Sequence, residues 1–222
     1  MLSTTERRRG YFITFEGLDG SGKSTQMRLF AERLRTAGHT VVETAEPGGT
    51  RIGGAIRSIL LNPENQDLSP TAEMLLYFAA RAQNVDELLL PALSRGEIVL
   101  SDRWTDSTYA YQGHGRQLGT GVVVDLDRVA CRSHNPDLTI WVDLDLDAGL
   151  QRARARNNET GATSESRMDE QEYEFYARVR RGYLELERLH PDRLRRVDGS
   201  GTPEQVAERV WSTWRGFAES HV

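Results

Sequence analysis

A glycine-rich stretch near the start of the chain has the residue types and spacing of a phosphate-binding loop. Residues 15–25 read FEGLDGSGKST, which fits the pattern G-x-x-x-x-G-K-[S/T] from Gly17 to Ser24. The glycines let the backbone curl until its N–H groups converge on phosphate oxygens. The lysine can reach the β- and γ-phosphates, and the Ser24 hydroxyl can ligate Mg²⁺. The residues predicted to bind the nucleotide are Gly17, Leu18, Asp19, Gly20, Ser21, Gly22, Lys23, Ser24 and Thr25.

The lysine of this loop, Lys23, is the only lysine in the sequence, and the other 27 of the 28 basic residues are arginine. Codon bias can explain the arginine excess by itself. A lysine at this one position nevertheless indicates that arginine would not serve there. A slim ammonium group fits inside a ring of backbone N–H groups, whereas a planar guanidinium is too wide.

The elements that must position this loop alternate between strands and helices. Apolar runs predict five strands, in residues 11–17, 40–49 (with a Pro-Gly-Gly turn), 97–103, 137–144 and 193–197. Helical periodicity predicts helices in residues 23–37, 51–61, 71–90, 122–132, 147–156, 173–189 and 203–217, with loops at 113–121 and 157–166. Buried strands that alternate with helices indicate an α/β fold, a parallel sheet of about five strands with helices on both faces. We expect a single domain over residues 1–222, with residues 1–10 disordered.

Composition narrows the class of protein further. The formal net charge of −5 argues against nucleic-acid or acidic-membrane partners, which usually need a basic surface. The single cysteine, Cys131, cannot form an intramolecular disulfide, and nothing suggests an oxidising compartment. The sequence shows neither a secretory signal nor an apolar run near the ~20 residues of a membrane span. We expect a cytoplasmic protein that acts on small molecules.

The predicted third strand ends in VLSDRW, so an aspartate and an arginine stand at its carboxyl end. In a parallel sheet this edge holds the ligand crevice. Asp102 is therefore a candidate to hold Mg²⁺, directly or through water, and Arg103 is expected to face the same crevice. A helix cap or a structural ion pair is the alternative for Asp102, and a plain surface position is the alternative for Arg103.

Five motifs follow one another along the chain: FEGLDGSGKST, EPGGT, YFAARAQ, SDRWTDSTYAYQGHGR and RARAR. In this order and at these separations they resemble the thymidylate kinase family, over residues 12–186. The resemblance implies a P-loop kinase fold with a mobile lid, here residues 152–167. It implies phosphorylation of dTMP to dTDP for deoxythymidine nucleotide synthesis, with ATP as donor and Mg²⁺ as cofactor. It also implies a homodimer.

The resemblance assigns the phosphate and sugar contacts of dTMP as well. It implies that Arg57 and Arg103 hold the phosphate, to which two guanidinium groups can donate several charge-assisted hydrogen bonds. It implies that Asp19 lies near the 3′-hydroxyl of the deoxyribose and that Tyr111 crowds the 2′ position. A core position is the alternative for Tyr111, as a surface position is for Arg57. Arg103 and Asp19, together with Lys23, are expected to act in catalysis.

For the thymine base, the resemblance implies stacking on Tyr77 and a hydrogen bond from Arg81 to a carbonyl. It implies that Thr108 reads the other hydrogen-bonding edge, and Gln112 is a further substrate-binding candidate. Phe78, the aromatic residue beside Tyr77, is expected in the core. The alternative for Tyr77 is also a core position on the helix face.

The segment QRARARNNETGATSESR, residues 151–167, resembles the lid that closes over ATP in this family. Some members carry an arginine in the phosphate loop, but here the loop reads LDGS at that place, so the lid is expected to supply the cation. Arg156 is the candidate for the transferring phosphoryl group, and Arg152 is expected near the ATP base or phosphates. The lid reads SRMD where Asp-Arg-x-Glu is frequent, which leaves Arg154 and Arg167 as alternatives. A solvated charged helix end is the other interpretation.

Two other functions remain as alternatives. A guanine-specific, nucleotide-hydrolysing switch would show Asn-Lys-x-Asp, which a chain with Lys23 as its sole lysine cannot contain. A kinase of a deoxynucleoside or another neutral hydroxyl would need a carboxylate to take the proton. A monophosphate has a second pKa near ~6 and is already a dianion at neutral pH. Arginines that reduce repulsion between two anions suit dTMP, or another nucleoside monophosphate.

Overall fold

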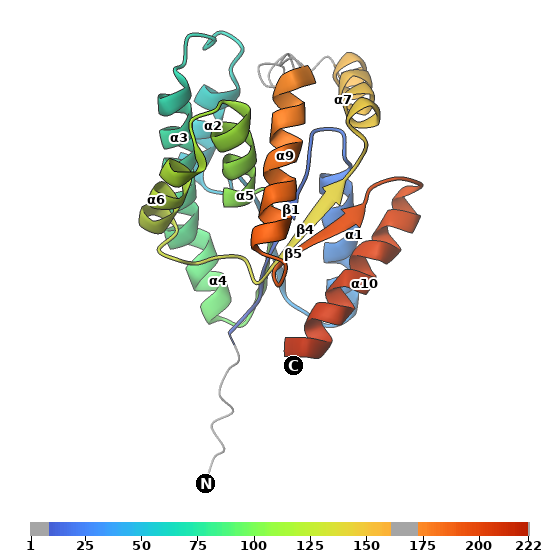
Figure 1. Ribbon diagram of the computed structural model, residues 1–222. Helices are drawn as coiled ribbons and strands as arrows, with labels where there is room; N and C mark the ends of the chain where they lie inside the picture. Colours follow the sequence, from blue (N-terminus) through green and yellow to red (C-terminus); the bar gives the residue numbers. More distant parts are fainter. Residues whose placement is uncertain (1–8, 161–172, 222) are drawn as a thin grey trace.

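The computed structural model describes residues 9–160 and 173–221, which form one parallel sheet with helices on both faces (Figure 1). The strands are β1 (Phe12–Glu16), β2 (Val41–Ala45), β3 (Ile98–Asp102), β4 (Leu138–Asp143) and β5 (Leu194–Asp198). Their order across the sheet is β2-β3-β1-β4-β5. The predicted α/β fold with a five-stranded parallel sheet is confirmed.

Helices connect the successive strands. After β1 comes α1 (Lys23–Thr36), and after β2 come α2 (Arg51–Leu61), α3 (Pro70–Asn84), the π-helical η1 (Val85–Leu89) and α4 (Leu90–Ser94). After β3 come α5 (Thr105–Thr108), the π-helical η2 (Tyr109–Gly115) and α6 (Thr120–Ala130). After β4 come α7 (Leu146–Thr160) and α9 (Tyr173–Leu189), and after β5 comes α10 (Pro203–His221). Within the described ranges, no helix is long and apolar enough to cross a membrane.

The core consists of two hydrophobic layers, one on each face of the sheet. Successive side chains of a strand point to opposite faces. Ile13 and Phe15 of β1 therefore pack with residues of α1 and α10, including Trp214. Phe12 belongs to the other layer, where its ring meets Trp104 edge to face at 4.9 Å. The same alternation turns the side chain of Glu16 into the layer of Phe12, with consequences for the site described below.

The carboxyl edge of the sheet is where the loops after β1 and β3 meet. These strands are neighbours, with Phe15 in register with Asp102. The chain crosses to β4 on the opposite side of β1, so the direction of the crossovers reverses beside this strand. In open α/β sheets, ligands bind at such a reversal, outside the carboxyl ends of the strands.

Several predicted boundaries are wrong; the closing helix predicted for 203–217, for example, is α10, which continues to His221. The helix predicted for residues 71–90 runs on to Ser94, because Pro91 falls in the first turn of α4, where a missing N–H is tolerated. The loop predicted for 113–121 is helical as far as Gly115. A Cβ at Gly115 would lie 2.6 Å from the Phe175 ring, so this glycine permits close packing rather than a turn. The loop predicted for 157–166 begins later, because α7 continues to Thr160.

The disorder predicted for residues 1–10 is wrong for the last two of them. Gly10 is buried, and its N–H donates to the carbonyl of Leu93 at 3.0 Å. Arg9 forms an ion pair with Asp137, the residue that precedes β4. The first eight residues lie outside the described part of the chain.

Candidate active site

A cavity of about 400 Å³ opens at the carboxyl edge of the sheet, between the loops after β1, β2 and β3 and the helices α3 and η2. The predicted site residues that line it are Asp19, Lys23, Ser24, Arg57, Tyr77, Arg81, Asp102, Arg103, Thr108, Tyr111 and Gln112. Lining residues outside that predicted set are Ala45, Glu46, Pro47, Gly48, Gly49, Gly54, Leu61 and Ser107. Residues predicted for the nucleotide and residues predicted for the acceptor thus share one cavity.

The loop between β1 and α1 has a backbone suited to phosphate. Gly17, Gly20 and Gly22 have φ values of 145°, 78° and 88°, a region that residues with a Cβ rarely adopt. Because α1 begins at Lys23, its first N–H groups have no partner within the helix and can bind an anion. Lys23 is buried, with its Nζ 3.5 Å from Oδ1 of Asp19.

The other side chains of the loop divide between core and solvent. Leu18 is buried in the hydrophobic layer that contains Phe12. Ser21 is buried, and its N–H donates to the carbonyl of Leu18 at 3.2 Å. Thr25, in the first turn of α1, is exposed. These three side chains are not part of the cavity lining, so their predicted nucleotide contacts remain predictions.

Ser24, in the first turn of α1, brings its hydroxyl to the carboxylate of Asp102 at the end of β3. Ser24 Oγ donates to Asp102 Oδ2 at 2.5 Å, and Asp102 Oδ1 is buried with no hydrogen-bond partner among the described residues. Within residues 9–160 and 173–221, no three His, Cys, Asp or Glu side chains gather to hold a metal. One carboxylate and one hydroxyl match the few protein ligands with which Mg²⁺ is bound beside substrate phosphates and water.

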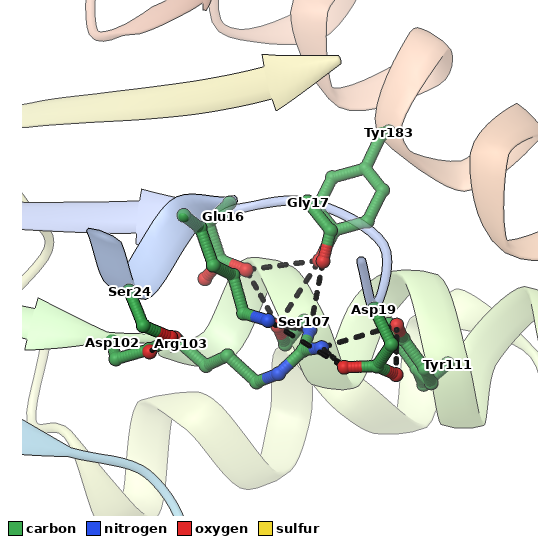
Figure 2. Close-up of polar contacts among 10 residues, drawn as sticks. Glu16, Gly17, Asp19, Ser24, Asp102, Arg103, Ser107, Tyr111 and Tyr183 are labelled. Atoms are coloured by element: carbon green, nitrogen blue, oxygen red, sulfur yellow. Dashed lines mark hydrogen bonds and ion pairs between the residues drawn. The ribbon is translucent and has the colours of Figure 1, made fainter. Parts of the chain in front are cut away.

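The side chain of Arg103 is held by several hydrogen bonds and is only 17% exposed. Its main chain has φ 72°, an uncommon value for a non-glycine residue, and its N–H donates to the carbonyl of Phe15 at 2.9 Å. Figure 2 shows its guanidinium among polar groups from several elements. It donates to the Gly17 carbonyl (3.1 Å), Ser107 Oγ (3.0 Å), Asp19 Oδ1 (2.7 Å) and the Tyr111 hydroxyl (3.2 Å). The surface alternative for Arg103 is therefore wrong.

Arg81 of α3 is a buried cation in the cavity wall, only 1% exposed. Its Nη2 donates to Thr108 Oγ1 at 3.0 Å, while Nε and Nη1 have no partner in the described part of the chain. Unpaired buried N–H groups are costly, so a ligand that accepts from them would stabilise this site. Tyr77, one helical turn earlier, is half-buried and lines the cavity. The core position predicted for Phe78 is confirmed.

Comparison with known proteins decides which reaction this site serves. A family model described as thymidylate kinase matches residues 15–210. The thymidylate kinase of Pelobacter propionicus is 49% identical over 201 residues, which are 90% of this chain and 92% of that protein. The thymidylate kinase of Geobacter sulfurreducens is 47% identical over 201 residues, 90% of this chain and 94% of that protein. The crystal structure of thymidylate kinase from Ehrlichia chaffeensis has a TM-score of 0.74 at 30% identity, covering 93% of this chain and 99% of that one.

The chain belongs to the thymidylate kinase family. The predicted reaction, transfer of a phosphoryl group from ATP to dTMP, is thereby confirmed, together with both substrates. The comparisons support neither the nucleotide-hydrolysing switch nor the deoxynucleoside kinase that the sequence left open.

The turn after β2 forms part of the cavity wall. Arg57, which is half-buried on α2, donates from Nη1 to the carbonyl of Pro47 at 2.9 Å. Gly49 has φ 75°, and a Cβ there would lie 2.1 Å from Thr44 Oγ1. The turn can therefore approach the sheet only with glycine at this position, and Arg57 is held beside it.

Two neighbouring residues of η2 reach the cavity from buried positions. Tyr111 belongs to the hydrophobic core and also lines the cavity, with its hydroxyl 3.3 Å from Asp19 Oδ2. Gln112 is held from behind, because its Nε2 donates to Glu73 Oε1 at 2.9 Å. Glu73 is fully buried and ion-paired with Arg116 at 3.2 Å. The core and cavity roles considered for Tyr111 are thus compatible.

The single turn of helix α5 is anchored at each of its residues. The partners come from four elements or their flanks: Thr105 bonds Asp127 (2.5 Å), Asp106 bonds Arg193 (2.6 Å), Ser107 bonds Glu16 (2.5 Å) and Thr108 bonds Arg81 (3.0 Å). The backbone of α5 is therefore held from several sides. Ser107 and Thr108 line the cavity, so their hydroxyl groups lie there at positions that these bonds fix.

The sequence analysis missed two buried glutamates at this edge. Glu16 ends β1 and Glu46 follows β2, and burial raises the pKa of each to about 7. For Glu46, the nearby charge of Arg81 opposes that rise, and Asn84 Nδ2 donates to its Oε1 at 2.6 Å. A signal was present, because both are acidic residues at the carboxyl ends of parallel strands, as is Asp102.

The predicted lid falls largely on residues whose side chains are not described. Arg152 is exposed on α7. Arg154 and Arg156 lie in the same helix, but their side chains are outside the described residues, as is the whole of Arg167. Which of these arginines reaches the phosphates stays a prediction.

Proposed function

We propose that dTMP occupies the cavity with its phosphate between Arg57 and Arg103, and that ATP lays its phosphates along the loop between β1 and α1. One observation carries this proposal. Lys23 and Ser24 of the loop line the same cavity as three arginines, Arg57, Arg81 and Arg103. Phosphoryl transfer requires donor and acceptor to be held side by side, and a shared cavity supplies that proximity.

The chemistry of the acceptor explains why arginines surround it. The phosphate of dTMP is mostly a dianion at neutral pH, because its second pKa is near ~6. It is therefore a competent nucleophile without a catalytic base, and the main barrier is repulsion between two anions. Arg103 is already oriented by Ser107 and Asp19, so little reorganisation is needed when the substrate binds. We assign Asp19 to the side of the deoxyribose, near its 3′-hydroxyl.

Mg²⁺ is the cofactor that the donor site fits. Ser24 and Asp102 would hold it, since the buried Oδ1 of Asp102 has no other partner among the described residues. When bound with the nucleotide, the ion would neutralise charge on the β- and γ-phosphates. Lys23 would act on the same phosphates from its buried position after Gly22.

Recognition of thymine is assigned to the α3 side of the cavity. Arg81 has two buried donors without a partner among the described residues, Nε and Nη1, and a thymine carbonyl would satisfy one of them. Thr108, Tyr111 and Gln112 complete the pocket around base and sugar. Tyr77 would stack on the ring, because every base has a π-face that an aromatic side chain can cover.

Replacing Tyr77 with alanine should weaken dTMP binding by about 1–3 kcal/mol, the range of base–aromatic stacking. ATP binding should hardly change, because Tyr77 lies on α3, away from the phosphate loop in the chain. Titration calorimetry with each nucleotide measures both effects on the same preparation.

A core residue of the same helix provides the control. Met74 is 2% exposed, so Met74→Ala should lower the melting temperature and leave the dTMP affinity of the folded protein unchanged. If Tyr77→Ala behaves in that way instead, Tyr77 is a core residue and the stacking assignment is wrong.

A homodimer is the proposed assembly, and the surface of α2, α3 and α6 supports it. Helix α3 packs against both α2 and α6, and Figure 1 shows the three on one side of the molecule. Large apolar side chains stand exposed on these helices: Ile52, Ile59, Leu75, Val122, Val124 and Val129. Apolar side chains that gather on adjacent helices are typical of protein–protein interfaces, so we assign this surface to the contact between two copies of the chain.

Leu75→Arg should convert the dimer to a monomer, because a second copy would have to bury the added charge. Light scattering coupled to gel filtration measures the mass directly. Leu189→Arg is the matched control: Leu189 is 46% exposed on α9, close to the 49% of Leu75, but lies on another element. A monomeric wild type, or loss of the dimer in both variants, would contradict the proposed interface.

A cytoplasmic location and a single kinase domain over residues 1–222 complete the proposal. The single cysteine, Cys131, is free and buried, and burial raises its pKa to about 12, against the opposing charge of Arg81. A buried neutral thiol suits a reducing compartment. The lid is assigned to residues 152–167, with Arg152 near the ATP base or phosphates.

A further inference from the structure

Glu16 is a buried carboxylate that accepts three hydrogen bonds, and it has no role in the phosphoryl transfer proposed for this site. It is fully buried and is not part of the cavity lining. Three groups donate to it: the main-chain N–H of Trp104 to Oε1 at 2.8 Å, and the hydroxyls of Ser107 (2.5 Å) and Tyr183 (2.9 Å) to Oε2. Figure 2 shows this cluster next to the guanidinium of Arg103.

Ser107 is the link between the buried carboxylate and the arginine. Its Oγ donates to Glu16 and accepts from Nη1 of Arg103 at 3.0 Å. A hydroxyl has one proton and two lone pairs. An ionised Glu16 can only accept, so the proton of Ser107 points to it and the lone pairs remain for Arg103. The Tyr183 hydroxyl also lies 3.0 Å from Ser107 Oγ. A donor in place of that carboxylate would occupy one lone pair of Oγ and leave the Ser107 proton without its acceptor, so the hydroxyl would have to turn and its bond with Arg103 would weaken.

We propose that Glu16 is a positioning residue for Arg103, which it orients through Ser107 to receive the phosphate of dTMP. The inference rests on the proposed role of Arg103 in binding that phosphate. The opposing pull on the guanidinium comes from Asp19, whose Oδ1 accepts from Nη2 at 2.7 Å. Without the bond to Ser107, the guanidinium would move towards Asp19, and it would bind the acceptor phosphate more weakly.

The charges around Glu16 make this arrangement sensitive to pH. Burial raises the pKa of Glu16 to about 7, the carboxylate of Asp106 adds to the rise, and Arg103 opposes it. Tyr183 of α9 donates to it, and Arg193, just before β5, neutralises Asp106. Glu16 is therefore ionised above this pKa and orients Ser107 there. As the pH falls through about 7, Glu16 becomes protonated and this orientation is lost.

Glu16→Gln tests the proposal. Glutamine keeps the volume and can still accept from Trp104, but presents an NH₂ group to Ser107, and so imitates protonated Glu16 at every pH. At about pH 8.5 the KM for dTMP should rise about tenfold, the loss expected for one hydrogen bond to a charged group, while the KM for ATP stays unchanged. At about pH 6 the two enzymes should converge, because wild-type Glu16 is then protonated. Ionisation of dTMP itself cancels in the ratio of the two KM values. A ratio that is close to one or constant over this range overturns the inference.

Further variants separate positioning from folding. Ser107→Ala removes the link itself and should raise the KM for dTMP to a similar extent at about pH 8.5. Ile13→Val removes a buried methyl group of the same strand, on the face of the sheet opposite Glu16, and should lower the melting temperature without changing that KM. If Ile13→Val raises the KM as Glu16→Gln does, general destabilisation is the cause and the inference is wrong.

Arg103→Ala separates the role proposed for Arg103 in binding the phosphate from the role proposed for Glu16 in positioning Arg103. If it leaves the KM for dTMP unchanged, the role proposed for Arg103 fails. If it raises that KM whereas Glu16→Gln does not, only the inference about Glu16 fails. In the Arg103→Ala background, Glu16→Gln should add no further rise, because both act through one guanidinium.

Discussion

Lys23→Arg is expected to abolish most phosphoryl transfer and to lower kcat by at least about 10²-fold. Removing one hydrogen-bond donor to the transition state lowers kcat by about this factor. The charge is kept, so the reason is geometric. The Lys23 side chain is 9% exposed, in a loop whose glycine backbone leaves little room. A Cβ at Gly17, for example, would lie 2.5 Å from the carbonyl oxygen of Val142. A planar guanidinium is wider than an ammonium group and cannot take the same path to the phosphates.

Steady-state ADP release measures this effect, and circular dichroism with thermal melting checks that the variant folds. Arg28→Lys is the mirror-image control on the same helix. Arg28 is exposed and pairs with Glu32 at 2.7 Å, so exchanging its head group should leave kcat unchanged. A folded Lys23→Arg protein with near-normal turnover would show that the lysine is incidental.

Arg156→Ala is expected to lower kcat by at least roughly 10²-fold, below the 10³–10⁵ that arginine fingers contribute elsewhere. Each arginine that lines the cavity already has a protein partner: Arg57 has Pro47, Arg81 has Thr108, and Arg103 has Asp19. The phosphate loop has no arginine of its own, which leaves Lys23 to face the charge that spreads over the γ-phosphoryl oxygens. The KM for dTMP should stay within a few-fold, the pattern of an interaction made mainly in the transition state.

Arg152→Ala is the matched variant on the same helix, and it should mainly raise the KM for ATP. Full kcat in Arg156→Ala would assign the transfer to Arg154 or Arg167 instead. Activity that survives removal of all four arginines would contradict the lid as the source of the cation. Single-turnover kinetics separates the chemical step from product release in each variant.

The sequence by itself determined the features of this kinase that depend on short stretches of chain. The loop from Gly17 to Ser24 is a local motif, because its glycines and lysine act within one turn between a strand and a helix. Asp102 and Arg103 could be placed at the ligand edge because every parallel strand ends there. The strand-helix alternation fixed the fold class for the same reason, since periodicity is read within each segment.

Only the tertiary structure decided which side chains meet. The partnership of Glu16 with Ser107 joins residues 91 positions apart, and that of Arg103 with Asp19 joins residues 84 apart. Such pairs follow from strand order, from which face of a strand a side chain takes, and from how helices pack on it. A local pattern carries none of these. Arg81 shows the limit most clearly: its motif predicted contact with a base, but its near-complete burial arises from packing against distant Trp104 and Thr108, and that burial is what leaves two N–H groups for a ligand.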